Sequence, residues 1–147
     1  MLFTRASKLM RSAADAAMGR LGVRLGQNLV MALLAEEDGL TPGQVASRLH
    51  VTTPTIVKMA TRMEATGLLT RRRDTRDARL VRLYLTDHGR SLIGPIEQEL
   101  RRLQTIATAN LTPEERRHLE RALTKIIKNL EELAPPAEHV EDEALSR

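Results

Sequence analysis

The stretch LTPGQVASRLHVTTPTIVKMATRMEATG, residues 40–67, contains two helix starts in close succession. The first has Thr41 as its N-cap, a proline at the first helical position and Gln44 three residues after the cap, which is the arrangement of a capping box. At the second, Thr53 is the expected cap and a proline again follows, while the glycine that closes the stretch suits a left-handed helix end. Only residues 50–52 separate the two helices. This spacing predicts a helix-turn-helix.

The stretch RRRDTRDARLVRLYLT, residues 71–86, combines dense charge with an alternating apolar pattern. Its first nine positions hold five arginines and two aspartates. Alternate apolar residues then share one face, as in a strand with one buried side: Val81, Leu83 and Leu85. We therefore expect a β-hairpin over residues 68–86, with a charged tip at 74–79.

Apolar residues recur at helical spacing on both sides of this central segment. Helices are expected over residues 2–20, 27–39 and 87–110, and the sequence TPEE at 112–115 is a second complete capping box that begins a last helix, which ends before Pro135. The first helix and the last two carry apolar stripes that one small module cannot cover. The simplest burial is against a second copy, so we expect an obligate homodimer.

Positive charge is concentrated in the middle of the chain. Residues 41–90 contain ten Lys and Arg against four Asp and Glu, a net of +6. Residues 91–147 contain eight against eleven, a net of −3, and residues 1–40 contain five against four, a net of +1, which together give the +4 of the whole chain. A compact basic segment is typical of proteins that bind phosphate backbones. Charge alone fits a basic surface without a partner equally well.

The composition excludes several kinds of site. One Phe, one Tyr and no Trp leave few rings on which bases could stack, which argues against a platform for single-stranded nucleic acid. The absence of cysteine excludes disulfides, thiolate metal sites and cysteine-based redox switches. The first residues lack the apolar run of a secretory signal, and no apolar run of membrane-spanning length follows. A cytoplasmic protein is therefore expected.

The second helix of the predicted helix-turn-helix has two contrasting faces. At about 100° per residue, one arc forms an apolar stripe that should be buried, made of Ile56, Met59, Ala60 and Met63. The other side is small and polar at first and basic further along, with Thr55, Val57, Lys58, Thr61 and Arg62. Such a face suits the major groove of duplex DNA, where hydroxyls and cations bond base edges and apolar groups meet thymine methyls.

Residues 40–90 resemble the winged helix-turn-helix of the MarR family of bacterial transcription regulators. The similarity rests on the pattern TxxxxxxxMExxGLLxR from Thr55 to Arg71, on DTRDAR at 74–79, and on Leu85, Thr86, Gly89 and Arg90 of the pattern LTxxGR. The resemblance implies a fold that is mainly α with a small β-hairpin wing, in which terminal dimerisation helices flank the DNA-binding module. It also implies a homodimer bound to a pseudo-palindromic operator, most simply as a repressor that occludes a promoter.

The resemblance assigns roles to individual residues. It places five residues of the second helix at major-groove positions: Thr53, Thr55, Val57, Lys58 and Arg62. Arg76 falls at the wing tip, where the family usually places an arginine in the minor groove. The charge of the hairpin itself, rather than the resemblance, adds Arg72, Arg73 and Arg79 as DNA-binding candidates, with the basic entry strand following the phosphates. Position 57 is commonly Ser or Thr in the family, so Val57 is a departure that can offer a methyl contact but no hydrogen bond.

The two aspartates of the wing would be unfavourable beside phosphates if they were unpaired. We expect Asp74 and Asp77 to brace the wing as partners of Arg72, Arg73 or Arg79, so that Arg76 is aimed at the DNA. Each such pair on the surface is worth only about 0–1 kcal/mol of stability, which does not affect a role in fixing the loop's shape.

The expected organisation has four parts: 1–26, an N-terminal dimerisation helix; 27–87, the DNA-binding module; 88–134, the C-terminal dimerisation helices; and 135–147, an acidic tail expected to be flexible. An enzyme is disfavoured, because the four histidines (His50, His88, His118 and His139) are scattered and accompany no nucleophile motif. No catalytic site, metal site or cofactor is assigned.

Two alternatives stay open at this stage. A metal-responsive regulator is conceivable because His and Glu suffice as zinc ligands, although no clustered histidine pair is present. An adaptor that binds protein through its winged helix is the other, and the basic stripe from Lys58 to Arg82 argues against it. The family resemblance also allows release by a small-molecule ligand. The sequence does not identify the ligand site. Four arginines could supply a positive group to it, although a solvated helix face explains each of them equally well: Arg11, Arg20, Arg24 and Arg90.

Overall fold

The two capped helices predicted from residues 40–67 are present in the computed structural model, which describes residues 1–133. They are α3 (Pro42–Leu49) and α4 (Thr53–Ala65). The first capping box is confirmed: the Thr41 hydroxyl accepts from the Gln44 amide at 3.2 Å, and the Gln44 side chain accepts from the Thr41 amide at 2.9 Å. His50 takes the left-handed conformation after α3, with φ of 54°, and so turns the chain into the next helix.

The cap of α4 lies one residue earlier than the sequence predicted. Thr52, not Thr53, is the last extended residue, with φ of −78° and ψ of 150°, and its carbonyl accepts the amide of Ile56. The Thr52 hydroxyl bonds the Thr55 hydroxyl at 2.8 Å instead of a backbone amide. Two adjacent threonines before a proline offer the same local signal, and the structure uses the first of them. The predicted left-handed end at Gly67 is confirmed, with φ of 75°.

The predicted hairpin is also present. Strand β1 (Leu69–Arg73) pairs antiparallel with β2 (Val81–Leu85), from Leu69 opposite Leu85 to Arg73 opposite Val81. Leu83 and Leu85 are buried and Val81 is half-buried, as the alternating pattern requires. On its other edge, β2 exchanges two backbone hydrogen bonds with the loop before α3, at Gly39 and Leu40.

That second pairing explains why the helix predicted over residues 27–39 is shorter. Helix α2 (Gln27–Glu36) ends three residues early, and Glu37 is already extended, with φ of −141°. Residues Asp38 to Leu40 leave the helix because their backbone and side-chain groups bond β2: the Gly39 amide donates to the Leu83 carbonyl at 2.9 Å, and the Asp38 carboxylate accepts from the Leu85 amide at 3.0 Å.

The core lies where α2, α3, α4 and the root of the hairpin meet. The stripe predicted on α4 is confirmed, since Ile56, Ala60 and Met63 are buried and Met59 is half-buried. They belong to one cluster with residues of every other element of the module, among them Met31, Leu34, Val45, Leu68 and Leu83.

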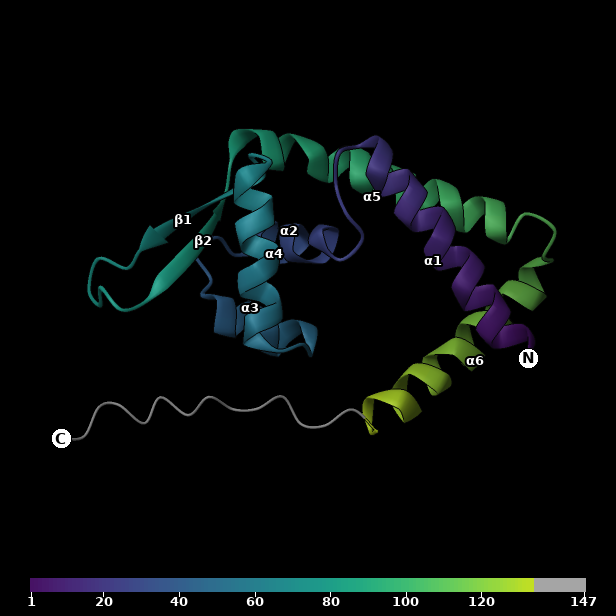
Figure 1. Cartoon of the computed structure of the whole chain (residues 1–147). Helices are drawn as coiled ribbons and strands as arrows, with labels where there is room; N and C mark the ends of the chain where they lie inside the picture. The colour runs from purple at the N-terminus through teal and green to yellow at the C-terminus, as the bar shows by residue number, and fades with distance from the viewer. Residues whose placement is uncertain (134–147) are drawn as a thin grey trace.

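The remaining helices lie outside this module (Figure 1). They are α1 (Leu2–Arg20), α5 (Asp87–Ala107) and α6 (Pro113–Glu131). Helices α1 and α5 lie side by side, and α6 ends the described chain far from the hairpin. Helix α6 turns back so that its end faces the turn between α3 and α4. None of the helices described is long and apolar enough to cross a membrane. The predicted acidic tail at 135–147 lies outside the described residues.

Helix α6 has the predicted capping box at Thr112 and Glu115 but no buried residue within the single chain. Its apolar side chains are exposed, with Ile127 at 54% and Leu130 at 53% of full exposure. Leu9 and Met10 on α1 and Ile106 on α5 are exposed as well.

The start of α5 is fixed against the root of the hairpin by one glycine. A Cβ on the buried Gly89 would lie 2.2 Å from the backbone oxygen of Leu68, so a larger residue must displace backbone. We expect Gly89→Ala to lower the free energy of unfolding by roughly 1–3 kcal/mol, the usual effect of overpacking. Chemical denaturation followed by circular dichroism measures the change.

Gly19→Ala is the matched control, since a Cβ there meets no atom within 4 Å. It should be neutral, or stabilising by about 0.5–1 kcal/mol, because alanine loses less entropy in a helix. Equal stabilities for the Gly89 and Gly19 variants would contradict the close contact.

Candidate nucleic-acid interface

Helix α4 presents the mixed polar and basic face that the sequence predicted. Thr55, Val57, Lys58, Thr61 and Arg62 are all exposed, and Thr53 is half-buried. The face therefore stands free of the core, on a helix whose opposite side is fixed within it.

The groups on this face differ in how they are already bonded. The Thr55 hydroxyl is paired with Thr52, and the Thr61 hydroxyl donates to the Val57 carbonyl at 3.0 Å. In contrast, Lys58 and Arg62 form no ion pair with any residue in 1–133. The two cations are thus available to an external anion at no internal cost, whereas the hydroxyls must exchange an existing bond.

A clamp that the sequence reasoning missed joins α4 to the hairpin. One Glu64 oxygen accepts from the Arg71 amide at 3.1 Å, and the other accepts from the Arg71 Nε at 2.8 Å. The Arg71 guanidinium also donates to the Thr61 hydroxyl at 3.3 Å. These bonds lower the pKa of Glu64, the backbone bond from Arg71 first and the side-chain bond second. The only signal in the sequence is the position of both residues within the pattern MExxGLLxR.

The tip of the wing is organised around Asp74. Its Oδ1 accepts from the amides of Arg76 at 2.7 Å and Asp77 at 3.0 Å, and its Oδ2 bonds the Nε of Arg82. Asp77 in turn accepts from both the amide and the Nε of Arg79, at 3.0 and 3.2 Å. Both aspartates are therefore engaged with groups of the wing itself.

The partner of Asp77 is one of the three arginines expected from the sequence, but the partner of Asp74 is not. Arg82 takes that place instead of Arg72 or Arg73. The strand register gives the reason: Arg72 lies directly opposite Arg82, where two like charges repel. Arg82 leans toward Asp74, and Arg72 leans the other way, with its guanidinium 4.9 Å from the centre of the Tyr84 ring.

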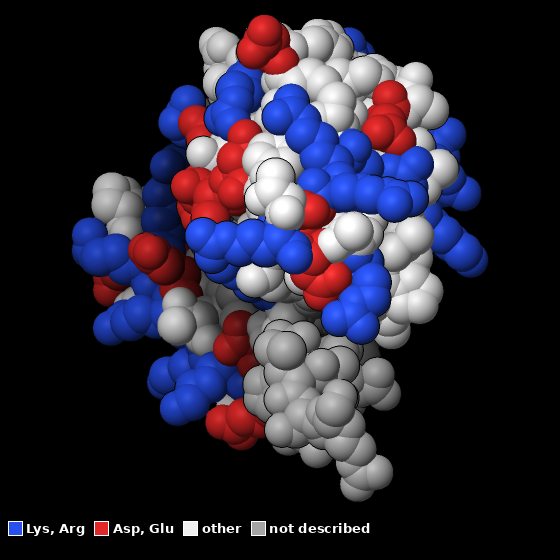
Figure 2. All heavy atoms as spheres, turned by 90° about the vertical axis from the view of Figure 1, so that its left-hand side faces the viewer, with Lys and Arg blue, Asp and Glu red and all other residues white. Residues whose placement is uncertain are grey.

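Arg76 projects from the tip with an exposed side chain. Its backbone amide is held by Asp74, while its guanidinium forms no ion pair within the described part of the chain. Figure 2 views the hairpin side of the molecule and shows Lys and Arg side chains gathered there, with acidic side chains between them. Arg72, Arg73 and Arg79 are exposed as well.

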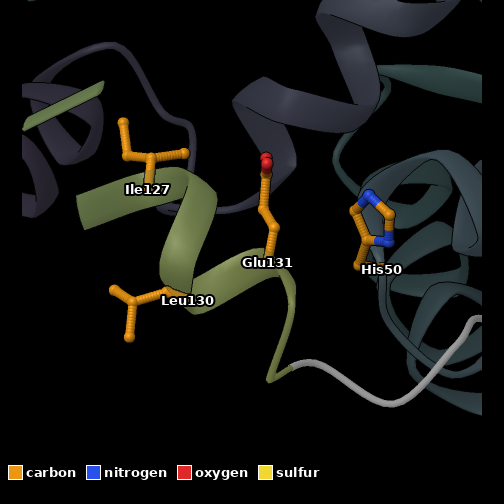
Figure 3. Close-up of a pocket in the computed structure, with 4 residues that line it drawn as sticks. All are labelled: His50, Ile127, Leu130 and Glu131. Carbon is orange, nitrogen blue, oxygen red and sulfur yellow. The ribbon is translucent and has the colours of Figure 1, made fainter. Parts of the chain in front are cut away.

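A hollow lies between the end of α6 and the turn before α4, lined by His50, Ile127, Leu130 and Glu131. In Figure 3 Glu131 extends from α6 on the side of His50, while Ile127 and Leu130 turn away from it. The described residues contain no group of three or more potential metal ligands of the His, Cys, Asp and Glu types. Of the other candidates, His118 lies 4.0 Å from Glu114 on α6, and Arg90 pairs with Asp38.

Comparison with known proteins places this geometry in a family. The family model described as "MarR family" matches residues 24–81. The chain is 30% identical over 105 residues to the transcriptional regulator AdcR of Streptococcus pneumoniae, a match that covers 69% of this chain and 70% of that protein. The chain belongs to the MarR family.

Two further relatives match this MarR family chain. The transcriptional regulator TtmR of Methylorubrum extorquens is 41% identical over 71 residues, which cover 48% of this chain and 36% of TtmR. The crystal structure of the Mycobacterium tuberculosis MarR family protein Rv2887 in complex with DNA matches with a TM-score of 0.68 and 25% identity, and the match covers 85% of this chain and 94% of that one. The chain spans about half the length of several curated relatives that it matches.

The contacts of Asp74 predict a measurable dependence on pH. The side-chain bond from Arg82, followed by the amides of Asp77 and Arg76, lowers the pKa of Asp74 from 3.8 to about 2. Because the folded state has the lower pKa, its extra stability is present above pH 4 and is lost as the pH falls through the folded value. We expect the Asp74 carboxyl carbon to titrate in NMR spectra with a midpoint near 2.

Asp74→Asn is the matched variant, because an amide oxygen can still accept from the two loop amides but carries no charge for Arg82. The wild-type protein should be more stable than this variant at neutral pH, and the difference should vanish as the pH falls from about 4 to about 2. A carboxyl midpoint at or above the ordinary value would contradict the assigned contacts.

Proposed function

We propose that this chain is a transcriptional regulator that binds a specific sequence of duplex DNA as a homodimer and acts as a repressor. The observation that carries the proposal is the exposed face of α4, whose cations Lys58 and Arg62 form no ion pair within residues 1–133 and share a module with a wing that ends in Arg76. Family membership supports it, as does the DNA complex of Rv2887, which is named a transcriptional repressor.

In this proposal α4 enters the major groove. Lys58 and Arg62 bond base edges or phosphates, Thr53 and Thr55 offer hydroxyls, and Val57 meets a thymine methyl. Arg76 enters the adjacent minor groove, where a narrow groove concentrates negative potential. Arg72, Arg73 and Arg79 neutralise phosphates beside it, while Asp74 and Asp77 fix the shape of the wing.

The proposed dimer joins the helices outside the module. Residues 1–26 and 88–134 form the dimerisation part, and residues 27–87 form the DNA-binding part. Support comes from α6, which buries nothing within one chain although its apolar side chains lie in a helical stripe. Two modules related by a two-fold axis would read half-sites whose centres lie about 34–36 Å apart.

Three further parts of the proposal follow from this role. The protein binds rather than catalyses, since its charged groups are arranged for anions and not around a nucleophile. It works in the cytoplasm, where its DNA partner lies. A small-molecule effector fits a regulator of this family, and the proposal assigns it neither a site nor an identity.

The wing assignment predicts that Arg76→Ala weakens binding by about 1–3 kcal/mol, the usual effect of losing one arginine at a groove. The operator can be selected by the wild-type protein from a randomised duplex library, and fluorescence anisotropy measures the affinity. Lys58→Ala should change either the affinity or the preferred sequence. Wild-type affinity in the Arg76 variant, with an unchanged fold, would remove the wing from the interface.

The salt dependence separates DNA binding from the adaptor alternative. Each phosphate contact releases counterions, so the affinity for the duplex should fall steeply and linearly on a plot against log salt concentration. An affinity for the selected duplex that does not change with salt concentration would contradict the proposal.

The dimer assignment predicts that Ile127→Glu yields monomers, because it places a charge within the uncovered apolar stripe of α6. Sedimentation velocity at micromolar concentration measures the mass. Lys125→Glu on the same helix is the control and should stay dimeric. A stable wild-type monomer under these conditions would refute the dimer.

A further inference from the structure

We propose that Arg82 is a positioning residue for DNA binding, which ties the tip of the wing to the loop between α2 and α3 and thereby aims Arg76. The proposal rests on the proposed function. Arg82 was not among the residues to which the family pattern assigns a contact, and it lies within β2 rather than at the tip.

The guanidinium of Arg82 spans two separate pieces of chain. Its Nε bonds the Oδ2 of Asp74, and its Nη1 donates to the Gly39 carbonyl at 2.9 Å. The two contacts use different nitrogens of one planar group, so a fixed guanidinium fixes both partners. Only 33% of the Arg82 side chain and 11% of the Asp74 side chain are exposed.

Asp74 passes this constraint on to the tip. Its second oxygen, Oδ1, holds the amides of Arg76 and Asp77. A continuous path of bonded groups therefore runs from the Gly39 carbonyl through Arg82 and Asp74 to the backbone of Arg76. Without Arg82, the tip would keep only contacts within the hairpin, which are the pairing of two five-residue strands and the bonds that Asp74 and Asp77 make to neighbouring residues of the tip.

The other end of the path is firmly anchored. Gly39 has φ of 81°, and a Cβ there would lie 3.1 Å from the ring of Tyr84. Its amide bonds the Leu83 carbonyl, and the neighbouring Asp38 holds both the Leu85 amide and the guanidinium of Arg90. Arg82 thus bonds a loop that is itself held to β2 and to α5 by hydrogen bonds.

Two other roles for Arg82 make different predictions. If Arg82 contacted a phosphate directly, only its positive charge would matter, and its contribution to the binding free energy would be additive with that of Arg76. A purely structural role would show in the stability of the fold and not in DNA binding. A positioning role acts through Arg76 and needs the planar fork of the arginine.

A double-mutant cycle tests this, with the duplex selected from a randomised library by the wild-type protein. Arg82→Ala should weaken binding by roughly ten-fold, comparable to the loss of one groove arginine. In the Arg76→Ala background the same change should have less than about a two-fold effect, since coupled residues are non-additive. Additive losses would overturn the proposal in favour of a direct contact.

Arg82→Lys is the second variant, and it keeps the charge while losing the fork. It should bind as weakly as Arg82→Ala, and recovery of wild-type affinity would overturn the positioning role. Arg73→Ala is the matched control, because Arg73 lies on the neighbouring strand and bonds neither Asp74 nor Gly39. Its loss of affinity should persist in the Arg76→Ala background.

Hydrogen exchange supplies the readout that does not depend on DNA. The Arg76 amide should exchange faster in Arg82→Ala, while the thermal unfolding midpoint of the protein stays within a few degrees of the wild type. Unchanged exchange at Arg76 would overturn the proposal. Selection of no duplex by the wild-type protein would overturn the proposed function and this inference with it, whereas additive losses on a selected duplex overturn the inference alone.

Discussion

The contact between Gly89 and the carbonyl of Leu68 determines how the helix-turn-helix and its hairpin join the long helices outside them. The two backbones approach so closely that no side chain fits between them. Thr86 closes the same junction: its hydroxyl donates to the Gly67 carbonyl at 2.6 Å and accepts from the Gly89 amide at 2.9 Å. The end of α4, the root of the hairpin and the start of α5 are therefore one rigid unit.

This junction matters for function because α5 leads from the module to the helices proposed to form the dimer. In a dimer, any change in the relative position of the two α5 helices would therefore move the two α4 helices, because no flexible segment separates α4 and the hairpin from α5. The hollow between α6 and His50 also separates the module from a helix outside it, at the turn between α3 and α4. In the proposed dimer, the distance between the two helix-turn-helix modules therefore depends on how the helices outside them pack.

The basic residues of the module differ in whether they are already paired with a carboxylate. Arg71 and Arg82 are each paired with a carboxylate and join separate pieces of the module, while Arg79 pairs with Asp77 within the tip of the wing. Lys58, Arg62 and Arg76 form no such pair within residues 1–133. A paired arginine fixes geometry at little net energy, and an unpaired one supplies charge to a partner. A basic patch counted from composition does not separate these groups.

The sequence by itself determined the elements and the two faces of α4. Capping boxes, glycines and apolar periodicity are local signals, and they identified each helix, the hairpin and the buried stripe of Ile56, Ala60 and Met63. It also led to the proposal of which residues contact DNA. Tertiary structure decided where α2 ends, because pairing of residues 38–40 with β2 competes with continuation of the helix. It alone decided that Asp74 pairs with Arg82, since that choice depends on a strand register and on a carbonyl 43 residues away in the chain.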